Sequence, residues 1–222
     1  MCGRFTFYTP PETLILDYFP EGLEVDGHFE PSYNITPGIG IPMIRTSMAG
    51  TPILAHSHWG FRPVWAGDKA PSPINARAES VATSKYFREA FAHHRCLIPA
   101  NGWFEWKQTE QGKEPHYVTP ADPQKHPVIF FAGLWTPMEG DETTACAIIT
   151  EPAGEPLKHI HDRQPVVLAP SCFQRWLDPG LTDRDSIRAA THRFAAEQLQ
   201  QFPVSTEVNN PRHNTPTLIN KV

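Results

Sequence analysis

Proline constrains this fold more than any other residue, because it occurs 24 times in 222 residues, alongside 14 glycines. Proline lacks a backbone N–H and is tolerated mainly at helix starts, at strand edges and in turns. Such a chain is expected to form many short elements joined by tight turns. This composition favours a β-rich or α+β fold over a helical bundle. Residues 1–222 can bury one large core, so a single domain is expected.

The remaining composition is typical of a globular, soluble protein, with 40% hydrophobic and 19% charged residues. Arg4 and Pro10-Pro11 interrupt any apolar run at the N-terminus, and no window is long enough to span a membrane. A cytoplasmic location without membrane contact is therefore expected. The net charge of −5 argues against a protein that coats long stretches of nucleic acid, but it permits a short, locally basic groove.

The cysteines indicate reduced thiols rather than a disulfide framework or a zinc site. Cys2, Cys96, Cys146 and Cys172 lie far apart, with no C-x-x-C pair. His56 and His58 fit strand-surface histidines better than metal ligands, because no third ligand follows at a suitable spacing. Neither a metal nor another cofactor is expected.

Cys2 is the first candidate for chemistry. A small second residue permits removal of the initiator Met1, which would leave an α-amine and a thiol on adjacent carbons of Cys2. Their reference pKa values are about 7.7–8.0 and about 8.5, so both groups are usable nucleophiles near neutral pH. The alternative is an ordinary small hydrophobic residue at the start of an edge strand.

The expected elements alternate between short strands and short helices. Thr9-Pro10-Pro11-Glu12 resembles a capping box that opens a helix ending at Pro20 or Gly22. Residues 30–38 are rich in turn formers and predict a rigid loop. A strand pair is expected at 39–44 and 52–59, with a turn near Ala49-Gly50. Further strands are expected at 96–100, 103–106, 116–119, 128–134, 144–150, 166–168 and 204–208, and helices or helical turns at 80–94, 155–160, 170–177 and 182–200.

Three further segments carry polar groups suited to a site. Asn75 and Arg77 alternate in an extended segment and so share a face, which suits an anionic ligand such as phosphate, although Arg77 and Glu79 could instead order a loop. Alternation in the 103–106 strand puts Trp103 and Glu105 on one face and Phe104 and Trp106 on the other. The aromatic surroundings would partly desolvate Glu105 and raise its pKa towards the acid–base range, unless it is an exposed strand carboxylate beside Lys107. His161 lies in an H-x-H segment followed by Asp162 and Arg163, which fits metal ligation or acid–base and phosphate roles.

Eight ordered segments carry a resemblance to a known family. They are Met1-Cys-Gly-Arg-Phe5, Tyr33-Asn-Ile-Thr-Pro37, Trp59-Gly60, Ile74-Asn-Ala-Arg-Ala-Glu79, Arg95-Cys-Leu-Ile-Pro99, Gly102-Trp-Phe-Glu-Trp106, Ile160-His-Asp-Arg-Gln-Pro165 and Val208-Asn-Asn210. Together they resemble the signature blocks of the SOS response-associated peptidase (SRAP) family. The resemblance implies an α+β fold, with a single compact domain around a curved, partly barrel-like mixed β-sheet and peripheral helices.

The resemblance also implies a function in the DNA damage response. A member of this family would bind single-stranded DNA at an abasic site and form a thiazolidine crosslink through its mature N-terminal cysteine. This is a lyase-like activity that follows self-removal or other processing of Met1. Such a protein would be a monomer that joins the nucleoid during DNA damage.

The resemblance implies a set of site residues, carried over residue by residue. The implied catalytic residues are Cys2, Asn75, Glu105 and His161. The implied DNA-binding residues are Arg4, Asn34, Pro37, Trp65, Arg77, Trp106 and Arg163, and Thr150 would support the site. Val64-Trp65-Ala66 stands where the bacterial relative has paired tryptophans, which weakens the stacking role of Trp65.

Two other classes of N-terminal-cysteine hydrolase remain open. Class II glutamine amidotransferases also begin with Met-Cys-Gly, but this chain lacks a recognisable synthetase domain and has Arg4 where an aliphatic residue is typical. A cysteine peptidase that acts on other proteins would be distinguished by turnover of a foreign peptide. A non-catalytic DNA-binding module would form no adduct that survives denaturation.

Overall fold

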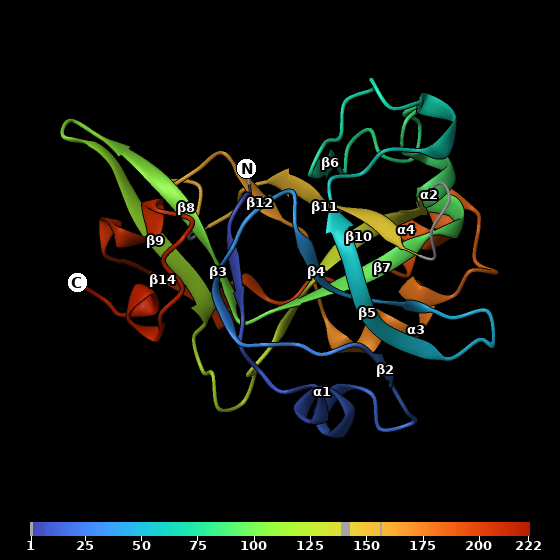
Figure 1. Cartoon of the computed structure of the whole chain (residues 1–222), viewed down its shortest axis with the longest axis horizontal. Coiled ribbons are helices and arrows are strands. Elements are labelled where there is room, and N and C mark those ends of the chain that lie inside the picture. Colours follow the sequence, from blue (N-terminus) through green and yellow to red (C-terminus); the bar gives the residue numbers. More distant parts are fainter. Residues whose placement is uncertain (1, 139–142, 156) are drawn as a thin grey trace.

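Two β-sheets form the framework of the protein. The structure, a computed structural model, describes residues 2–138, 143–155 and 157–222. Within those residues the smaller sheet has five strands in the order β14-β9-β8-β1-β3. Their bounds are β1 Phe5–Phe7, β3 Ser32–Ile35, β8 Gly102–Thr109, β9 Gly112–Pro120 and β14 Leu199–Pro203. In Figure 1 this sheet lies on the left, and its β8–β9 hairpin extends away from the body.

The larger sheet closes on itself. Its main path is β12-β11-β10-β7-β4-β5-β2, with β13 paired to β10 and β6 paired to β11. Parallel pairing of Ala145 with His58 joins β11 to β5, so five strands form a ring: β11, β10, β7, β4 and β5. The strand bounds are β2 Glu24–Asp26, β4 Gly40–Thr46, β5 Pro52–Trp59, β6 Asn75–Arg77, β7 Arg95–Ala100, β10 Ile129–Pro137, β11 Thr144–Pro152, β12 Arg163–Pro165 and β13 Val167–Leu168. The predicted α+β class with a partly barrel-like mixed sheet is confirmed.

Short helices lie at the periphery of the sheets (Figure 1). The α-helices are α1 Pro11–Tyr18, α2 Arg88–His93, α3 Phe173–Leu177 and α4 Arg184–Ala189. The 3-10 helices are η1 Val64–Ala66, η2 Pro170–Cys172, η3 Ala196–Gln198, η4 Thr206–Asn209 and η5 Pro216–Ile219. Among the described residues, no helix has the length and apolar character needed to cross a membrane.

Strand β8 separates two hydrophobic cores. Trp103 belongs to the main core, whereas Phe104 packs in a second core with Tyr117, Val208 and Leu218. This alternation follows from the period of two along a strand, and it confirms the predicted separation of Trp103 from Phe104. Because the C-terminal 3-10 helices cover the second core, both faces of β8 are buried near its start.

Asn101 lies where the chain passes from the larger sheet into the smaller one. Its side chain accepts a hydrogen bond from the Tyr8 backbone N–H (2.7 Å) and donates to Thr9 Oγ1 (2.6 Å) and to the Pro127 carbonyl (2.7 Å). The next residue must be glycine, because a Cβ on Gly102 would lie 2.4 Å from the Val118 carbonyl oxygen. The start of β8, and hence its registration with β1, is fixed at this point.

Four local predictions are wrong or incomplete. The capping box is wrong, because Pro10 is the N-cap of α1 without a side-chain cap bond, and Thr9 instead bonds Asn101. The 30–38 loop contains strand β3, and the expected strand at 204–208 is η4, preceded by β14. In the expected 155–160 helix, residues 157–160 form a turn that follows Gly154, and residue 156 lies outside the described residues.

Candidate active site at the N-terminus

Cys2 is held in the interior by the strands on either side of β1. Its side chain is fully buried. Phe5 pairs with Trp103 of β8 and with Ile35 of β3, and the Phe104 N–H donates to the Arg4 carbonyl (2.9 Å). The N-terminal end therefore lies beside β3 and β12 in Figure 1, at the pole opposite α1. Met1 lies outside the described residues, so its predicted processing stays a prediction.

Asn75 contacts the backbone of Cys2 directly. The Asn75 Nδ2 donates to the Cys2 carbonyl oxygen (2.9 Å). Strand β6 places it there by parallel pairing with β11, in which Asn75 lies opposite Ile148. Asn75 Oδ1 is also buried and has no hydrogen-bond partner in the described part of the chain. An amide fixed by a core strand can hold the N-terminal residue in one orientation.

Glu105 is a buried carboxyl close to Cys2. Only 4% of Glu105 is exposed, which excludes the alternative of an exposed strand carboxylate. Burial raises its pKa to about 7 because the charged form loses hydration. Burial of Cys2 itself, together with the negative charge of the nearby Glu105, raises the pKa of the Cys2 thiol well above its ordinary value. At neutral pH the thiol is thus protonated, whereas Glu105 exchanges its proton readily.

His161 shares a small cavity with Glu105. Both residues line a space of about 10 Å³ together with Trp103, Val118, Leu157, Ile160, Arg163 and Gln164, and this volume matches a single water molecule. Nδ1 of His161 accepts a hydrogen bond from the Arg163 N–H (2.9 Å), and the side chain is partly exposed. Burial lowers the His161 pKa, so the ring is largely neutral at pH 7. Two groups able to exchange protons therefore lie beside one site.

The arginines predicted to bind DNA have different partners. Nη1 of Arg4 donates to Asn34 Oδ1 and to the Val208 carbonyl, both at 2.7 Å, and its guanidinium lies 5.7 Å from the centre of the Trp106 ring. Asn34 in turn donates to the His213 carbonyl (2.7 Å). This cluster of Arg4 and Asn34 joins the N-terminal segment to residues 208–213, so its contacts stabilise the fold.

Arg163 is held by an ion pair that the sequence did not reveal. Its two terminal nitrogens contact the two carboxylate oxygens of Glu79, and Nη2 also donates to the Thr150 carbonyl (2.7 Å). Thr150, placed in a supporting role by the resemblance, thus contacts Arg163 directly. Glu79 lies in the same short segment as Arg77, but its ion pair is with Arg163 rather than the alternative contact with Arg77. Arg77 itself is exposed.

The remaining predicted DNA contacts lie at the surface. Pro37 is exposed, and 59% of Trp65 is exposed. The Trp65 ring packs edge-on against Tyr86, with the Lys85 ammonium 5.3 Å from its centre. The structure therefore brings Cys2, Asn75, Glu105 and His161 together, whereas Arg77, Pro37 and Trp65 have no described contact with Cys2. No cluster of His, Cys, Asp and Glu side chains in the described ranges could hold a metal ion.

The chain is similar to known proteins along most or all of its length. The family model of the SOS response associated peptidase (SRAP) matches residues 1–211. The abasic site processing protein YedK of Escherichia coli (strain K12) is 35% identical to this chain over 234 residues, and the match covers 100% of both chains. The abasic site processing protein YoqW of Bacillus subtilis (strain 168) is 33% identical, and the match covers 99% of both chains. A crystal structure of a protein from Bacteroides thetaiotaomicron has a TM-score of 0.82, 22% identity and full coverage of both chains, a likeness of fold.

Proposed function

Because the chain belongs to the SOS response associated peptidase (SRAP) family, we propose that it processes abasic sites in single-stranded DNA by forming a covalent crosslink through Cys2. The relatives named as abasic site processing proteins support the lesion as substrate. The arrangement around Cys2 supports the chemistry, because it holds the residue that becomes the N-terminus after removal of Met1 close to a carboxyl that exchanges protons near neutral pH.

The reaction joins an amine, an aldehyde and a thiol. The ring-opened abasic sugar carries an aldehyde, and the α-amine of Cys2 adds to its carbon to give a carbinolamine. Loss of water leaves an imine, whose carbon the Cys2 thiol then attacks, while the thiol proton passes to the nitrogen. The product is a five-membered thiazolidine, and the only molecule released is water. No external oxidant or cofactor is needed.

The amine attacks before the thiol in this scheme. Burial keeps the Cys2 thiol protonated, so it is a weak nucleophile until the imine is next to it. An α-amine with an ordinary pKa of about 7.7–8.0 has on the order of a tenth of its molecules uncharged at neutral pH. Removal of Met1 is a precondition, because the nitrogen is a non-nucleophilic amide while the Met1–Cys2 bond persists.

Glu105 shuttles protons at the amine and at the departing oxygen. A carboxyl with a pKa of about 7 is suited to both tasks, since it is present in both protonation states at neutral pH. His161, neutral and partly exposed beside the same cavity, acts as a second acid–base group on the opened sugar. Asn75 orients the chain end through the Cys2 carbonyl.

Positive and aromatic side chains hold the DNA strand so that its abasic site lies at Cys2. Arg4, Arg77 and Arg163 contact phosphates, and Trp65 and Trp106 offer ring surfaces, while Asn34 and Pro37 shape the path. Arg77 is the most direct of these phosphate ligands, because Arg4 and Arg163 already contact protein groups. Phosphate binding at Arg163 competes with Glu79.

The observation that carries the proposal is the shared position of Glu105 and Asn75 against Cys2. A denaturing gel tests it with an abasic oligonucleotide and an undamaged control of the same sequence. Purified protein lacking Met1 should give a shifted band with the abasic strand alone. Cys2→Ser should give a band only after borohydride reduction, because serine retains the amine that forms the imine but not the thiol. A persistent Cys2→Ser band without reduction would contradict the thiazolidine.

A further inference from the structure

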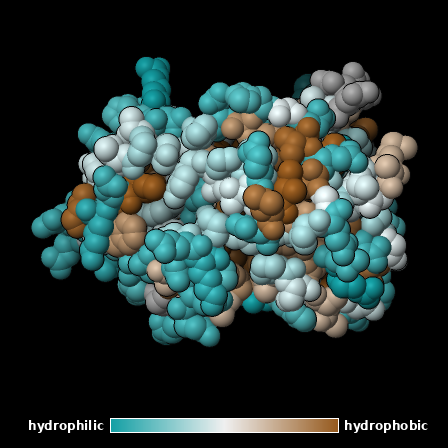
Figure 2. All heavy atoms as spheres, turned by 90° about the horizontal axis from the view of Figure 1, so that it is seen from below, coloured by the Kyte–Doolittle hydropathy of each residue, from teal (hydrophilic) through white to brown (hydrophobic). Residues whose placement is uncertain are grey.

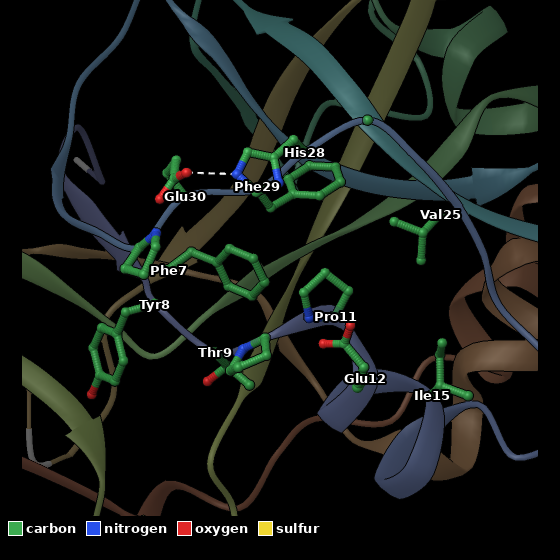
Figure 3. A pocket seen from close by; sticks show the side chains of 13 residues that line it. Phe7, Tyr8, Thr9, Pro11, Glu12, Ile15, Val25, His28, Phe29 and Glu30 are labelled. Atoms are coloured by element: carbon green, nitrogen blue, oxygen red, sulfur yellow. Dashed lines mark hydrogen bonds and ion pairs between the residues drawn. The ribbon is translucent and has the colours of Figure 1, made fainter.

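A second hollow lies at the opposite end of β1 from Cys2. It measures about 380 Å³ and is enclosed by the start of α1, strand β2 and residues 27–31. Its walls are largely apolar, and in Figure 3 Phe7, Pro11, Ile15, Val25 and Phe29 surround the opening. The carboxyl groups of Glu12 and Glu30 also line it. None of the residues assigned to the N-terminal site contributes to this groove.

The groove adjoins an open sheet edge. Strand β2 ends the main path of the larger sheet, where it pairs in parallel with β5 and has no second β partner among the described residues. All three of its residues are exposed. Alternation places Val25 on the groove face, whereas Glu24 and Asp26 point the other way. An edge strand of this kind offers unpaired backbone groups to an added strand.

The surroundings are both acidic and apolar. Residues 5–44 contain no lysine or arginine but six carboxylates: Glu12, Asp17, Glu21, Glu24, Asp26 and Glu30. Leu16 is 78% exposed and Val25 is 42% exposed. Figure 2, which views the molecule from below, shows hydrophobic side chains gathered over the region of α1 and β2 with hydrophilic ones around them.

We propose that this groove and the β2 edge bind an extended basic segment of a partner protein by strand addition. Basic side chains at alternate positions would face Glu24 and Asp26, and the apolar ones between them would enter the groove beside Val25. The acidic surroundings repel nucleic acid and so favour a polypeptide. Because the groove lies at the pole opposite the N-terminus, the protein could hold a partner segment and a damaged DNA strand at the same time (Figure 1).

Fluorescence anisotropy with a labelled, amidated Lys-Leu-Lys-Phe-Lys-Leu-Lys peptide tests the proposal on the full chain. The parent protein should bind the peptide in low salt, and a Glu12→Lys, Asp26→Lys variant should bind about tenfold more weakly or less. A matched variant with the same charge change at exposed sites elsewhere, Glu110→Lys with Glu197→Lys, should retain the parent affinity within about twofold. The milder Glu12→Gln, Asp26→Asn variant should fall between them, which guards against misfolding of the charge-reversed form.

Backbone N-methylation of the peptide separates strand addition from simple charge attraction. Methylating alternate amides in the register that faces the strand should abolish binding, whereas methylating the other register should leave it largely intact. Saturating peptide should also leave the crosslinking yield with abasic DNA unchanged. Absence of peptide binding to the parent, equal binding by the two charge-reversed variants, or insensitivity to N-methylation in both registers would each overturn the proposal.

Discussion

Glu105 illustrates how one residue can favour chemistry at the expense of stability. Alternation along β8 turns it toward the main core beside Trp103, and burial raises its pKa to about 7. The sequence indicated that aromatic neighbours would desolvate this carboxyl, but spacing alone slightly favoured an exposed position. Packing over this face of β8 decides in favour of burial, because Glu105 shares the lining of one small cavity with Val118, Leu157 and Ile160.

Replacing Glu105 with Gln should stabilise the protein at alkaline pH. A carboxyl whose folded pKa lies above its unfolded value near 4.5 gives stability that is complete below pH 4.5 and is lost as pH rises toward 7. Gln does not ionise, so the variant should exceed the parent by up to about 3 kcal/mol at pH 8 and match it near pH 4. Urea unfolding at both pH values measures the difference. A constant difference between pH 4 and pH 8 would contradict the assigned pKa.

The same Glu105→Gln variant should crosslink abasic DNA slowly. Loss of a proton-transferring group typically lowers a rate by about 10²- to 10⁴-fold, and here it should slow both imine formation and its reversal. Quenched-flow sampling with borohydride trapping gives the imine rate. A rate within about threefold of the parent would remove Glu105 from the proton-transfer role. Stability and activity should thus change in opposite directions at one residue.

At the scale of elements, the passage between the two sheets depends on Asn101. Its amide makes three hydrogen bonds of 2.6–2.7 Å to two segments that are far apart in the chain, Tyr8-Thr9 and Pro127. Removing it leaves the Tyr8 N–H and the Pro127 carbonyl without this partner, and each buried polar group left unpaired costs about 1–3 kcal/mol.

We therefore expect Asn101→Ala to lower the free energy of unfolding by at least about 2 kcal/mol. The control is Asn220→Ala, an exposed asparagine, which should change it by less than about 0.5 kcal/mol. Chemical denaturation followed by tryptophan fluorescence measures both. Equal midpoints for the two variants would show that the Asn101 bonds do not hold the sheets together.

Regular alternation was easier to predict from sequence than pairing between distant segments. The β4–β5 hairpin and the two faces of β8 follow from local patterns, and both predictions hold. The 30–38 segment contains β3 because its partner, β1, supplies the hydrogen bonds that its turn-forming residues would otherwise make locally. Asn34 likewise bonds residues 208–213 rather than neighbours in its own segment.

At the scale of the whole molecule, two groups of charged residues lie apart. The acidic residues 12–30 lie in and after α1 and in β2, whereas Arg77 and Arg163 belong to β6 and β12 and Arg4 directly precedes β1. The sequence indicated residues 2, 75, 105 and 161 as separate candidates, and only the family resemblance joined them into one site. They converge through pairing of strands that lie far apart in the chain. The Arg163–Glu79 ion pair left no signal in the spacing, because 84 residues separate its members.

Binding of single-stranded DNA should depend on Arg77 through its charge. Because each phosphate neutralised releases counterions, Arg77→Ala should weaken binding and reduce the slope of log K against log salt by about 0.7. Lys125, an exposed residue between β9 and β10, is the matched control, and Lys125→Ala should retain the parent slope. Anisotropy titrations from low to high salt provide the slopes. Identical slopes for the parent and Arg77→Ala would exclude Arg77 as a phosphate ligand.

The central claim is that the crosslink forms at the α-amine of a processed Cys2, and intact-mass spectrometry tests it most directly. A preparation that contains both processed chains and chains that retain Met1 is incubated with an abasic oligonucleotide, denatured without reduction and weighed. The proposed reaction predicts that the mass of the DNA adduct, minus one water, appears only on chains lacking Met1. A stable adduct on chains that retain Met1 would contradict both the amine-first order and the need for N-terminal processing.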